Sequence, residues 1–330
     1  MRAQAFPPYS FRDEFGSRFA GTRVLVTGAS GFVGTHLVQA LREVGARVTG
    51  VGLPDLTSSA ANPDGFLATD LTEAGAAAAA VESVNPELVF HLAGLVDTRQ
   101  VPEAVIPTLK HNLLAAVHLM DSLVGIGCQR VVIVTSSESP PADQVPNSPY
   151  AASKLAVASY AGMYSTLFGL PVVIARPHMV FGPNQSPEKV IPYLIHCGLE
   201  NKPPRLASGK RLCDPVYVMD LVRALLLLAL ADGASGRTVD IGAGMALSIA
   251  EIARRVLSLM GASSAPAFGA LPDRTGEVPQ VADLTSLRDV VAWEPLWSFD
   301  RAIRETIDWY AQRRGPAPAD HSPASHEGMG

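Results

Sequence analysis

A glycine-rich turn, TGASGFVG at residues 27–34, follows directly on the apolar run RVLVT and precedes a stretch with helical periodicity. Glycines at this spacing allow a tight turn, a close approach of the backbone to a ligand, and close packing of a helix against a strand. The N-terminus of the following helix favours an anion such as a pyrophosphate. Because the flanking strand and helix are both present, the turn predicts a dinucleotide site rather than an ordinary connection.

The same rhythm of a short β-branched run followed by a helical pattern is repeated along the first half of the chain. Near-continuous apolar strands are typical of a parallel sheet that is covered on both faces. The expected strands are 23–27, 47–51, 88–92, 130–135 and 171–176, and the expected helices are 33–44, 106–125 and 150–168. This order predicts an α/β fold built on a doubly wound parallel sheet.

The rhythm breaks after about residue 177, where Pro/Gly-rich loops alternate with isolated helices. We therefore expect a dinucleotide-binding domain over 21–177, with later segments returning to it, and a smaller mixed α/β substrate lobe mainly over 178–311. The two ends are rich in Pro, Ser, Ala and charge. This composition predicts a flexible N-terminal extension over 1–20 and a disordered tail over 312–330.

Composition excludes several classes of protein. The chain has 330 residues, 48% of them hydrophobic and 17% charged, which is typical of a soluble globular protein with a large core. A net charge of −5 and the lack of any Lys/Arg-rich run argue against a nucleic-acid partner. Three widely spaced cysteines favour a reducing cytoplasm over a disulfide framework or a metal site. The longest aliphatic run, 224–230, is too short to span a bilayer, so no membrane partner is expected.

Further motifs follow the glycine turn, whose spacing is G-x-x-G-x-x-G. They are DL (70–71), HLAG (91–94), HN (111–112), SS (136–137), YAASK (150–154), RPHMVFGP (176–183) and DPVYVMDLV (214–222). In this order they resemble the extended short-chain dehydrogenase/reductase superfamily, in its branch of nucleotide-sugar epimerases, dehydratases and reductases, from about residue 23 to 310. The resemblance implies a Rossmann domain, an NAD or NADP cofactor, a nucleotide-sugar substrate and a homodimer.

The resemblance also implies which residues hold the cofactor. The turn would cradle the pyrophosphate, an Asp-Leu pair would meet the adenine, the end of a strand would line the ribose, and an asparagine would stabilise the central helix near the site. In chain order the residues are Gly28, Ser30, Gly31, Phe32, Val33, Gly34, Asp70, Leu71, Leu92, Ala93, Gly94, Asn112, Tyr150, Lys154 and Pro177. For Asp70 alone, capping of a helix before Glu73 is the competing explanation.

The proton chemistry is assigned to Tyr150 and Lys154, which project from one face of a helix because they are four residues apart. The positive charges of the lysine and of an oxidised nicotinamide are expected to lower the pKa of the tyrosine, so that the phenol can act as general acid or base. By the resemblance, Ser137 hydrogen-bonds the substrate oxygen and Lys154 also holds the nicotinamide ribose. Ser136 is the nearest competitor for the serine role.

Departures from the family pattern refine the substrate chemistry. Family dehydratases generally carry a glutamate two residues after the catalytic Ser/Thr, whereas this chain has Ser139 there and Glu138 as the only nearby acid. Dehydration is therefore disfavoured, and Glu138 becomes a candidate for contact with the substrate. Twelve residues separate Ser137 from Tyr150, about half of what sugar epimerases of the family commonly carry. The wall of the sugar pocket is expected to differ accordingly.

Three more candidates concern the substrate. Arg274 matches an arginine that would bind the diphosphate of the nucleotide, since a guanidinium fork suits two phosphate oxygens. Arg211 is placed to substitute for a second arginine, whose own position is Cys213. Met179 stands where the family keeps an asparagine that touches the substrate. These replacements leave the nucleotide base unassigned.

The choice between NAD and NADP stays open at the end of the second strand. The family's ribose-binding acid falls on Gly52, which can neither bond a 2′-hydroxyl nor repel a 2′-phosphate. Asp55 could reach back to bind NAD, or Thr57, Ser58 and Ser59 could receive the phosphate of NADP.

The sequence thus predicts an NAD(P)-dependent oxidoreductase or epimerase that acts on a nucleotide-diphosphate sugar. Hydride would move between the nicotinamide and a sugar carbon, C4 by preference, while Tyr150 handles the proton of the oxygen. One alternative is a net 4-ketoreductase that consumes NAD(P)H. Another, from a different class, is a dinucleotide-sensing protein without catalysis, which the intact Ser137, Tyr150 and Lys154 set disfavours.

Overall fold

The computed structural model describes residues 9–53, 64–140, 144–276 and 278–313. It divides into two compact units, each assembled from segments that are distant in sequence. The first consists of residues up to Val180, Asp214–Ala246 and Gln280–Leu296, and the second of Phe181–Cys213, Leu247–Pro279 and the chain from Trp297 onward. The first unit therefore includes two stretches, 214–246 and 280–296, from the range that the sequence assigned mainly to the substrate lobe.

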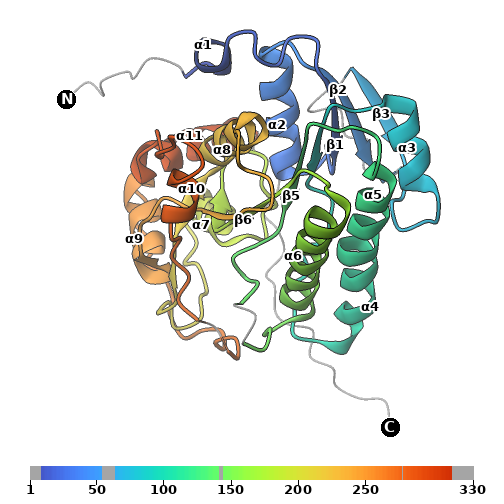
Figure 1. The fold of residues 1–330 in the computed structure, drawn as a ribbon. Helices are drawn as coiled ribbons and strands as arrows, with labels where there is room; N and C mark the ends of the chain where they lie inside the picture. Colours follow the sequence, from blue (N-terminus) through green and yellow to red (C-terminus); the bar gives the residue numbers. More distant parts are fainter. Residues whose placement is uncertain (1–8, 54–63, 141–143, 277, 314–330) are drawn as a thin grey trace. The chain divides into compact units, whose positions relative to one another are not determined.

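The first unit contains a seven-stranded sheet with the order β10-β6-β5-β4-β1-β2-β3 (Figure 1). All of its neighbouring pairs are parallel. The strands are β1 (Arg23–Thr27), β2 (Arg47–Gly52), β3 (Gly65–Ala68), β4 (Leu88–His91), β5 (Arg130–Val134), β6 (Val172–Pro177) and β10 (Thr238–Ile241). The predicted doubly wound sheet is confirmed. The strand order reverses between β1 and β4, and ligands of such sheets bind beyond the carboxyl ends of the strands at that point.

Helices cover both faces of this sheet (Figure 1). On one face, α2 (Phe32–Glu43) and the almost wholly apolar α8 (Val218–Leu230) share a core with the strands. On the other face, α3 (Ala76–Val84), α5 (Ala115–Leu123) and α6 (Pro149–Phe168) form a second core. The remaining elements near this unit are η2 (Pro102–Ala104), α4 (Val105–Thr108), η3 (Leu109–Leu114), β7 (Met179–Phe181), β9 (Pro215–Tyr217) and α10 (Thr285–Arg288).

The helix that the sequence predicted over 106–125 is divided into three parts. A short α4 leads into the π-helical stretch η3, and regular α-helix resumes as α5. A π-helical turn holds one more residue than an α-helical turn, and such insertions are frequent at functional sites. Here the insertion includes Asn112, one of the predicted site residues.

The prediction of a flexible N-terminal extension is wrong for residues 9–20. Ser10 caps the short helix α1 (Phe11–Phe15) by accepting a hydrogen bond from the backbone N–H of Asp13. Phe11, Phe15 and Phe19 are at most 2% exposed and belong to the core under α2 and α8. Three aromatic side chains spaced four residues apart bury enough apolar surface to order the segment despite its charges.

The second unit is a small mixed α/β assembly. Its helices α7 (Val190–Glu200), α9 (Ile249–Met260) and α11 (Phe299–Gln312) pack against one another. The strands β8 (Leu212–Cys213) and β11 (Leu247–Ser248) form an antiparallel pair, and Ser248 with Glu251 forms a capping box that starts α9. No helix within the described ranges is long and apolar enough to cross a membrane.

Candidate active site

The glycine turn has the shape that a bound pyrophosphate needs. Gly28 adopts a positive φ of 68°, and a Cβ built on it would lie 2.8 Å from the backbone nitrogen of Ala93, beyond β4. A Cβ on Gly34 would lie only 2.1 Å from the carbonyl oxygen of Gly28. Gly31 forms the N-cap of α2 without any side-chain cap, so the first N–H groups of this helix are available to an anion. The predicted cofactor residues here fit a dinucleotide.

The end of β2 adjoins this turn. A Cβ on Gly52 would lie 3.2 Å from Ser30 Oγ and 3.1 Å from the ring of Phe66. A larger side chain at this position would therefore displace one of these neighbours. The alternatives for recognising the ribose, Asp55, Thr57, Ser58 and Ser59, lie outside the described residues.

The Asp-Leu pair forms a turn rather than the start of a helix. One carboxylate oxygen of Asp70 accepts a hydrogen bond from the backbone N–H of Thr72 at 2.9 Å. Leu71 is buried, and its carbonyl oxygen lies 3.0 Å from Nδ1 of His118 on α5. The contact of this pair with adenine remains a prediction.

Asn112 connects the segment after β4 with helix α6. Its Nδ2 donates to the carbonyl of Leu95 and, at 2.8 Å, to Ser153 Oγ, while its Oδ1 accepts from the N–H of Leu95 at 2.6 Å. A Cβ on Gly94 would lie 2.9 Å from that Oδ1 and 3.3 Å from Lys154 Nζ. The π-helical insertion thus brings the predicted ribose segment, Leu92–Gly94, against the lysine of α6.

Tyr150 and Lys154 lie in the first turns of α6, which starts at its N-cap Ser148 with Pro149 as the first helical residue. Each of the two side chains is only 6% exposed. Lys154 Nζ donates to the carbonyl of Val134, the last residue of β5, at 3.1 Å. Burial lowers the pKa of Lys154 to about 8. The pair is therefore held in a fixed position at the carboxyl end of the sheet.

The phenol of Tyr150 is protonated in the protein alone. Burial raises its pKa, a hydrogen bond with the Ser136 side chain lowers it, and the charge of Glu138 raises it, so that the pKa is about 12. The lowering that the sequence predicted is not seen because burial dominates. A cofactor with a positive nicotinamide would supply the missing charge.

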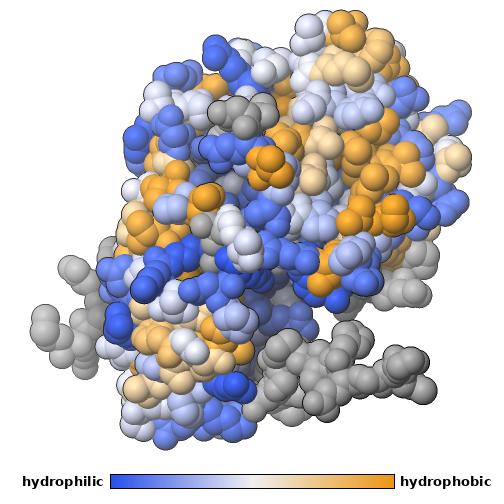
Figure 2. Space-filling model, turned by 90° about the horizontal axis from the view of Figure 1, so that it is seen from below, coloured by the Kyte–Doolittle hydropathy of each residue, from blue (hydrophilic) through white to orange (hydrophobic). Residues whose placement is uncertain are grey.

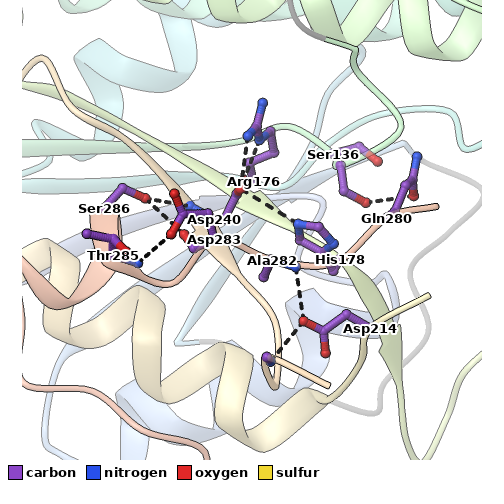
Figure 3. Close-up of polar contacts among 12 residues, drawn as sticks. Ser136, Arg176, His178, Asp214, Asp240, Gln280, Ala282, Asp283, Thr285 and Ser286 are labelled. Carbon is purple, nitrogen blue, oxygen red and sulfur yellow. Dashed lines mark hydrogen bonds and ion pairs between the residues drawn. The ribbon is translucent and has the colours of Figure 1, made fainter. Parts of the chain in front are cut away.

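The two adjacent serines have different partners. Ser136 bonds with the phenol of Tyr150, and its Oγ also accepts from the N–H of Glu138 at 3.1 Å. Ser137 Oγ donates to Oε1 of Gln280, which is labelled in Figure 3, at 3.1 Å. The N–H of Ser137 donates to the carbonyl of Pro177 at 3.0 Å. The sequence named Ser136 only as the competitor of Ser137 and missed Gln280, which no motif marks and which is 143 residues away.

A partly buried ionic cluster lies at the end of β6. Arg176 and Asp240 are register partners on β6 and β10, and the guanidinium bonds both carboxylate oxygens (Figure 3). His178 Nε2 lies 3.8 Å from Asp240 Oδ2. Burial opposes ionisation of Asp240, but its neighbours His178 and Arg176 outweigh burial and lower the pKa to about 2. The cluster fixes the backbone on both sides of Pro177.

Asp214 organises two segments with one carboxylate. The side chain is fully buried and accepts hydrogen bonds from the backbone N–H groups of Ala243, Gly244, Met245 and Ala282, at 2.8, 2.9, 3.2 and 3.1 Å. A Cβ on Gly242 would lie 2.3 Å from Asp214 Oδ2, so the loop after β10 can approach only because residue 242 is glycine. The sequence analysis included Asp214 in the motif at 214–222 but did not predict that it accepts these four hydrogen bonds.

The four candidates for substrate contact are divided between the units. Glu138 and Met179 are half-buried in the first unit, where the N–H of Met179 donates to the carbonyl of Asp214 at 3.1 Å. Arg211 and Arg274 lie in the second unit, where Arg274 is exposed. All four assignments remain predictions.

A protein family and several known proteins are similar to this chain over most of its length. The model of the "NAD dependent epimerase/dehydratase family" matches residues 24–242. The chain is 30% identical to a UDP-glucose 4-epimerase of Mycolicibacterium smegmatis, with 88% of this chain and 99% of that protein covered. It is also 30% identical to a probable dTDP-glucose 4,6-dehydratase of Sinorhizobium fredii, with coverages of 88% and 93%. The solved UDP-glucose 4-epimerase of Thermus thermophilus in complex with NAD is 26% identical and superimposes with a TM-score of 0.77 over 88% of this chain and 99% of that one.

Proposed function

This chain belongs to the NAD-dependent epimerase/dehydratase family, as the motifs predicted, and on that premise we propose that it moves hydride between a nicotinamide and a carbon of a nucleotide-diphosphate sugar. C4 is the carbon we favour, and epimerisation is the net reaction. The observation that carries the proposal is the buried pair Tyr150 and Lys154 at the carboxyl end of β5, where the lysine is close to the segment after β4 and that segment is in turn close to the glycine turn.

The residue at position 139 disfavours dehydration. The family's dehydratases place a glutamate there to remove a ring proton, and this chain has a serine, which is 5% exposed and has no acid–base capacity at neutral pH. The similarity to a dehydratase therefore supports the cofactor and the class of substrate but not that reaction. Glu138 is kept as a group that contacts the sugar.

We assign the following roles in the proposed reaction to residues of this chain. Tyr150, in its deprotonated form, takes the proton of the sugar hydroxyl and becomes a neutral phenol, and Ser136 stabilises the phenolate before this transfer by its hydrogen bond. Ser137 bonds the sugar oxygen and keeps it near the phenol. Lys154 holds the ribose, and the bound dinucleotide, when present, supplies the hydride acceptor. Arg274 and Arg211 are proposed to bind the diphosphate.

The experiment that tests the function has two parts. Purified protein is heat-denatured and the released nucleotides are identified. Native protein is assayed with UDP-glucose, dTDP-glucose and a 4-keto derivative of dTDP-glucose, with and without added NAD(H) or NADP(H). Retained NAD or NADH and turnover without added cofactor would support epimerisation. Stoichiometric consumption of NAD(P)H with a keto sugar would identify the 4-ketoreductase instead. Bound dinucleotide without turnover of any nucleotide sugar would overturn the proposal in favour of a sensing protein.

Two substitutions next to Tyr150 should shift the pH dependence of turnover in opposite directions. The hydrogen bond from Ser136 lowers the pKa of the phenol and the charge of Glu138 raises it. Since oxidation needs the deprotonated phenol, Ser136→Ala should move the acid limb of the kcat/KM profile to higher pH and Glu138→Gln should move it to lower pH. The exposed Glu82 on α3 provides the control Glu82→Gln, which should leave the profile unchanged. Shifts in the same direction would refute this origin of the tyrosine pKa.

We also propose that the protein is a homodimer. Several large apolar side chains of α4, η3 and the end of α6 are exposed, among them Ile106 at 58% and Leu167 at 68%. Apolar residues also surface as separate patches among polar ones on the face seen in Figure 2. Covering these helices with a second copy would remove the apolar area from water. Sedimentation of the purified protein measures the mass, and a monomer at micromolar concentration would contradict the proposal.

A further inference from the structure

The contact between Ser137 and Gln280 joins two distant parts of the first unit. Gln280 opens the segment Gln280–Leu296, which returns to this unit after the chain has passed through the second one. The side-chain oxygen of Gln280 accepts the hydroxyl proton of Ser137 at 3.1 Å (Figure 3). Gln280 is half-buried. It belongs neither to the glycine turn nor to the helix that carries Tyr150 and Lys154.

The backbone at Ser137 and the backbone near Gln280 are each held by a contact that involves neither of these two side chains. The N–H of Ser137 is bonded to the carbonyl of Pro177. Two residues after Gln280, the N–H of Ala282 is bonded to the buried carboxylate of Asp214 at 3.1 Å (Figure 3). Loss of the contact between the two side chains would therefore leave both of these backbone contacts in place.

A serine hydroxyl has a single proton to donate and two lone pairs that accept. While the proton of Ser137 points at Gln280, only the lone pairs are available to a substrate. A sugar alcohol can donate to them, whereas a keto sugar, whose oxygen has no proton, cannot. The direction of one O–H bond thus decides which form of the substrate Ser137 receives.

We propose that Gln280 is a positioning residue that directs the Ser137 O–H, so that Ser137 accepts the hydroxyl of the incoming sugar alcohol. The proposal rests on the function proposed above. After the sugar hydroxyl has given its proton to Tyr150 and its carbon is oxidised, the Ser137 O–H turns from Gln280 to the carbonyl oxygen. Gln280 consequently stabilises the complex with the alcohol and contributes little at the keto stage.

The test separates binding of the sugar from binding of the nucleotide. The dissociation constants of UDP-glucose and UDP, and of dTDP-glucose and dTDP, are measured by calorimetry for the wild type and for Gln280→Met, which keeps the size but removes the acceptor. For the nucleotide sugar that is turned over, Gln280→Met should raise Kd and KM about three- to tenfold, the worth of one hydrogen bond. The Kd of the nucleoside diphosphate and kcat should stay within about twofold.

Three further variants distinguish positioning from damage. Gln280→Glu retains an acceptor oxygen and should restore the wild-type KM, whereas the exposed Gln39 on α2 gives the control Gln39→Met, which should change nothing. In a Ser137→Ala background, Gln280→Met should have no further effect on KM.

Four results would overturn the inference. They are an unchanged KM in Gln280→Met, equal losses for the sugar nucleotide and the bare nucleotide, failure of Gln280→Glu to restore KM, and a full additional loss in the Ser137→Ala background. If the wild type turns over neither sugar nucleotide, the proposed function itself fails, and the inference with it.

Discussion

Tyr150→Phe should reduce turnover of the nucleotide sugar by roughly 10²–10⁴-fold, the range that general acid–base catalysis contributes. The phenol is 6% exposed, and its hydroxyl bonds Ser136, so loss of one oxygen removes the proton acceptor without opening a cavity. Affinity for the dinucleotide should be nearly unchanged. Steady-state turnover and titration of the cofactor by fluorescence measure the two quantities separately.

Lys154→Ala should behave differently, because the ammonium is expected to hold the ribose as well as to assist the phenol. Turnover and cofactor affinity should both fall. Tyr160, which is 42% exposed on the same helix, gives the control Tyr160→Phe, and this variant should retain full activity. Near-normal turnover in Tyr150→Phe would refute the mechanism. Equal losses of cofactor affinity in the Tyr150 and Lys154 variants would indicate structural damage to α6.

Asp214→Asn should lower the free energy of unfolding by about 2–4 kcal/mol. Each carboxylate oxygen accepts two backbone N–H groups, so the amide nitrogen of asparagine would face two of these four donors. A buried donor without an acceptor costs about 1–3 kcal/mol. Urea unfolding followed by circular dichroism, in the absence of cofactor, measures the difference.

The exposed Asp289 in the same unit provides a matched control. Asp289→Asn should change the unfolding free energy by no more than about 0.5 kcal/mol, as is usual for surface substitutions. An unfolding midpoint of Asp214→Asn equal to that of the control would mean that the four hydrogen bonds contribute nothing net. It would also remove the support that Asp214 gives to the segment carrying Gln280.

The sheet and its phosphate-binding turn were predictable because their signals are local. Buried parallel strands are apolar over most of their length, and the glycine turn joins a strand to a helix within eight residues, so each pattern can be recognised in a short window. The boundaries shift by a residue at β2, β4, β5 and β6. The position of Tyr150 and Lys154 on one helix face follows from their spacing alone.

The remaining features depend on contacts between distant residues or on a competition of effects. The composition of residues 9–20 indicated disorder, yet the burial of Phe11, Phe15 and Phe19 outweighs the charges between them. The sequence analysis placed the residues of β10 in the substrate lobe, because they follow the break in the strand–helix pattern. Only the pairing of β10 with β6 shows that they belong to the sheet. The hydrogen-bond partners of Ser136 and Ser137 depend on how the two side chains are oriented in the folded protein. The periodicity of the sequence contains no information about this orientation.

The chain passes between its two units five times, after residues 180, 213, 246, 279 and 296. Neither unit is therefore a continuous piece of sequence that could be inherited, expressed or lost alone. A fragment that ends at Val180 would lack β10 and α8, so β6, an inner strand of the complete sheet, would become an edge, and one face would lose part of its cover. Such an edge is prone to pairing with other chains. During synthesis the sheet can be completed only after Phe181–Cys213 of the second unit, which precede β10, have left the ribosome.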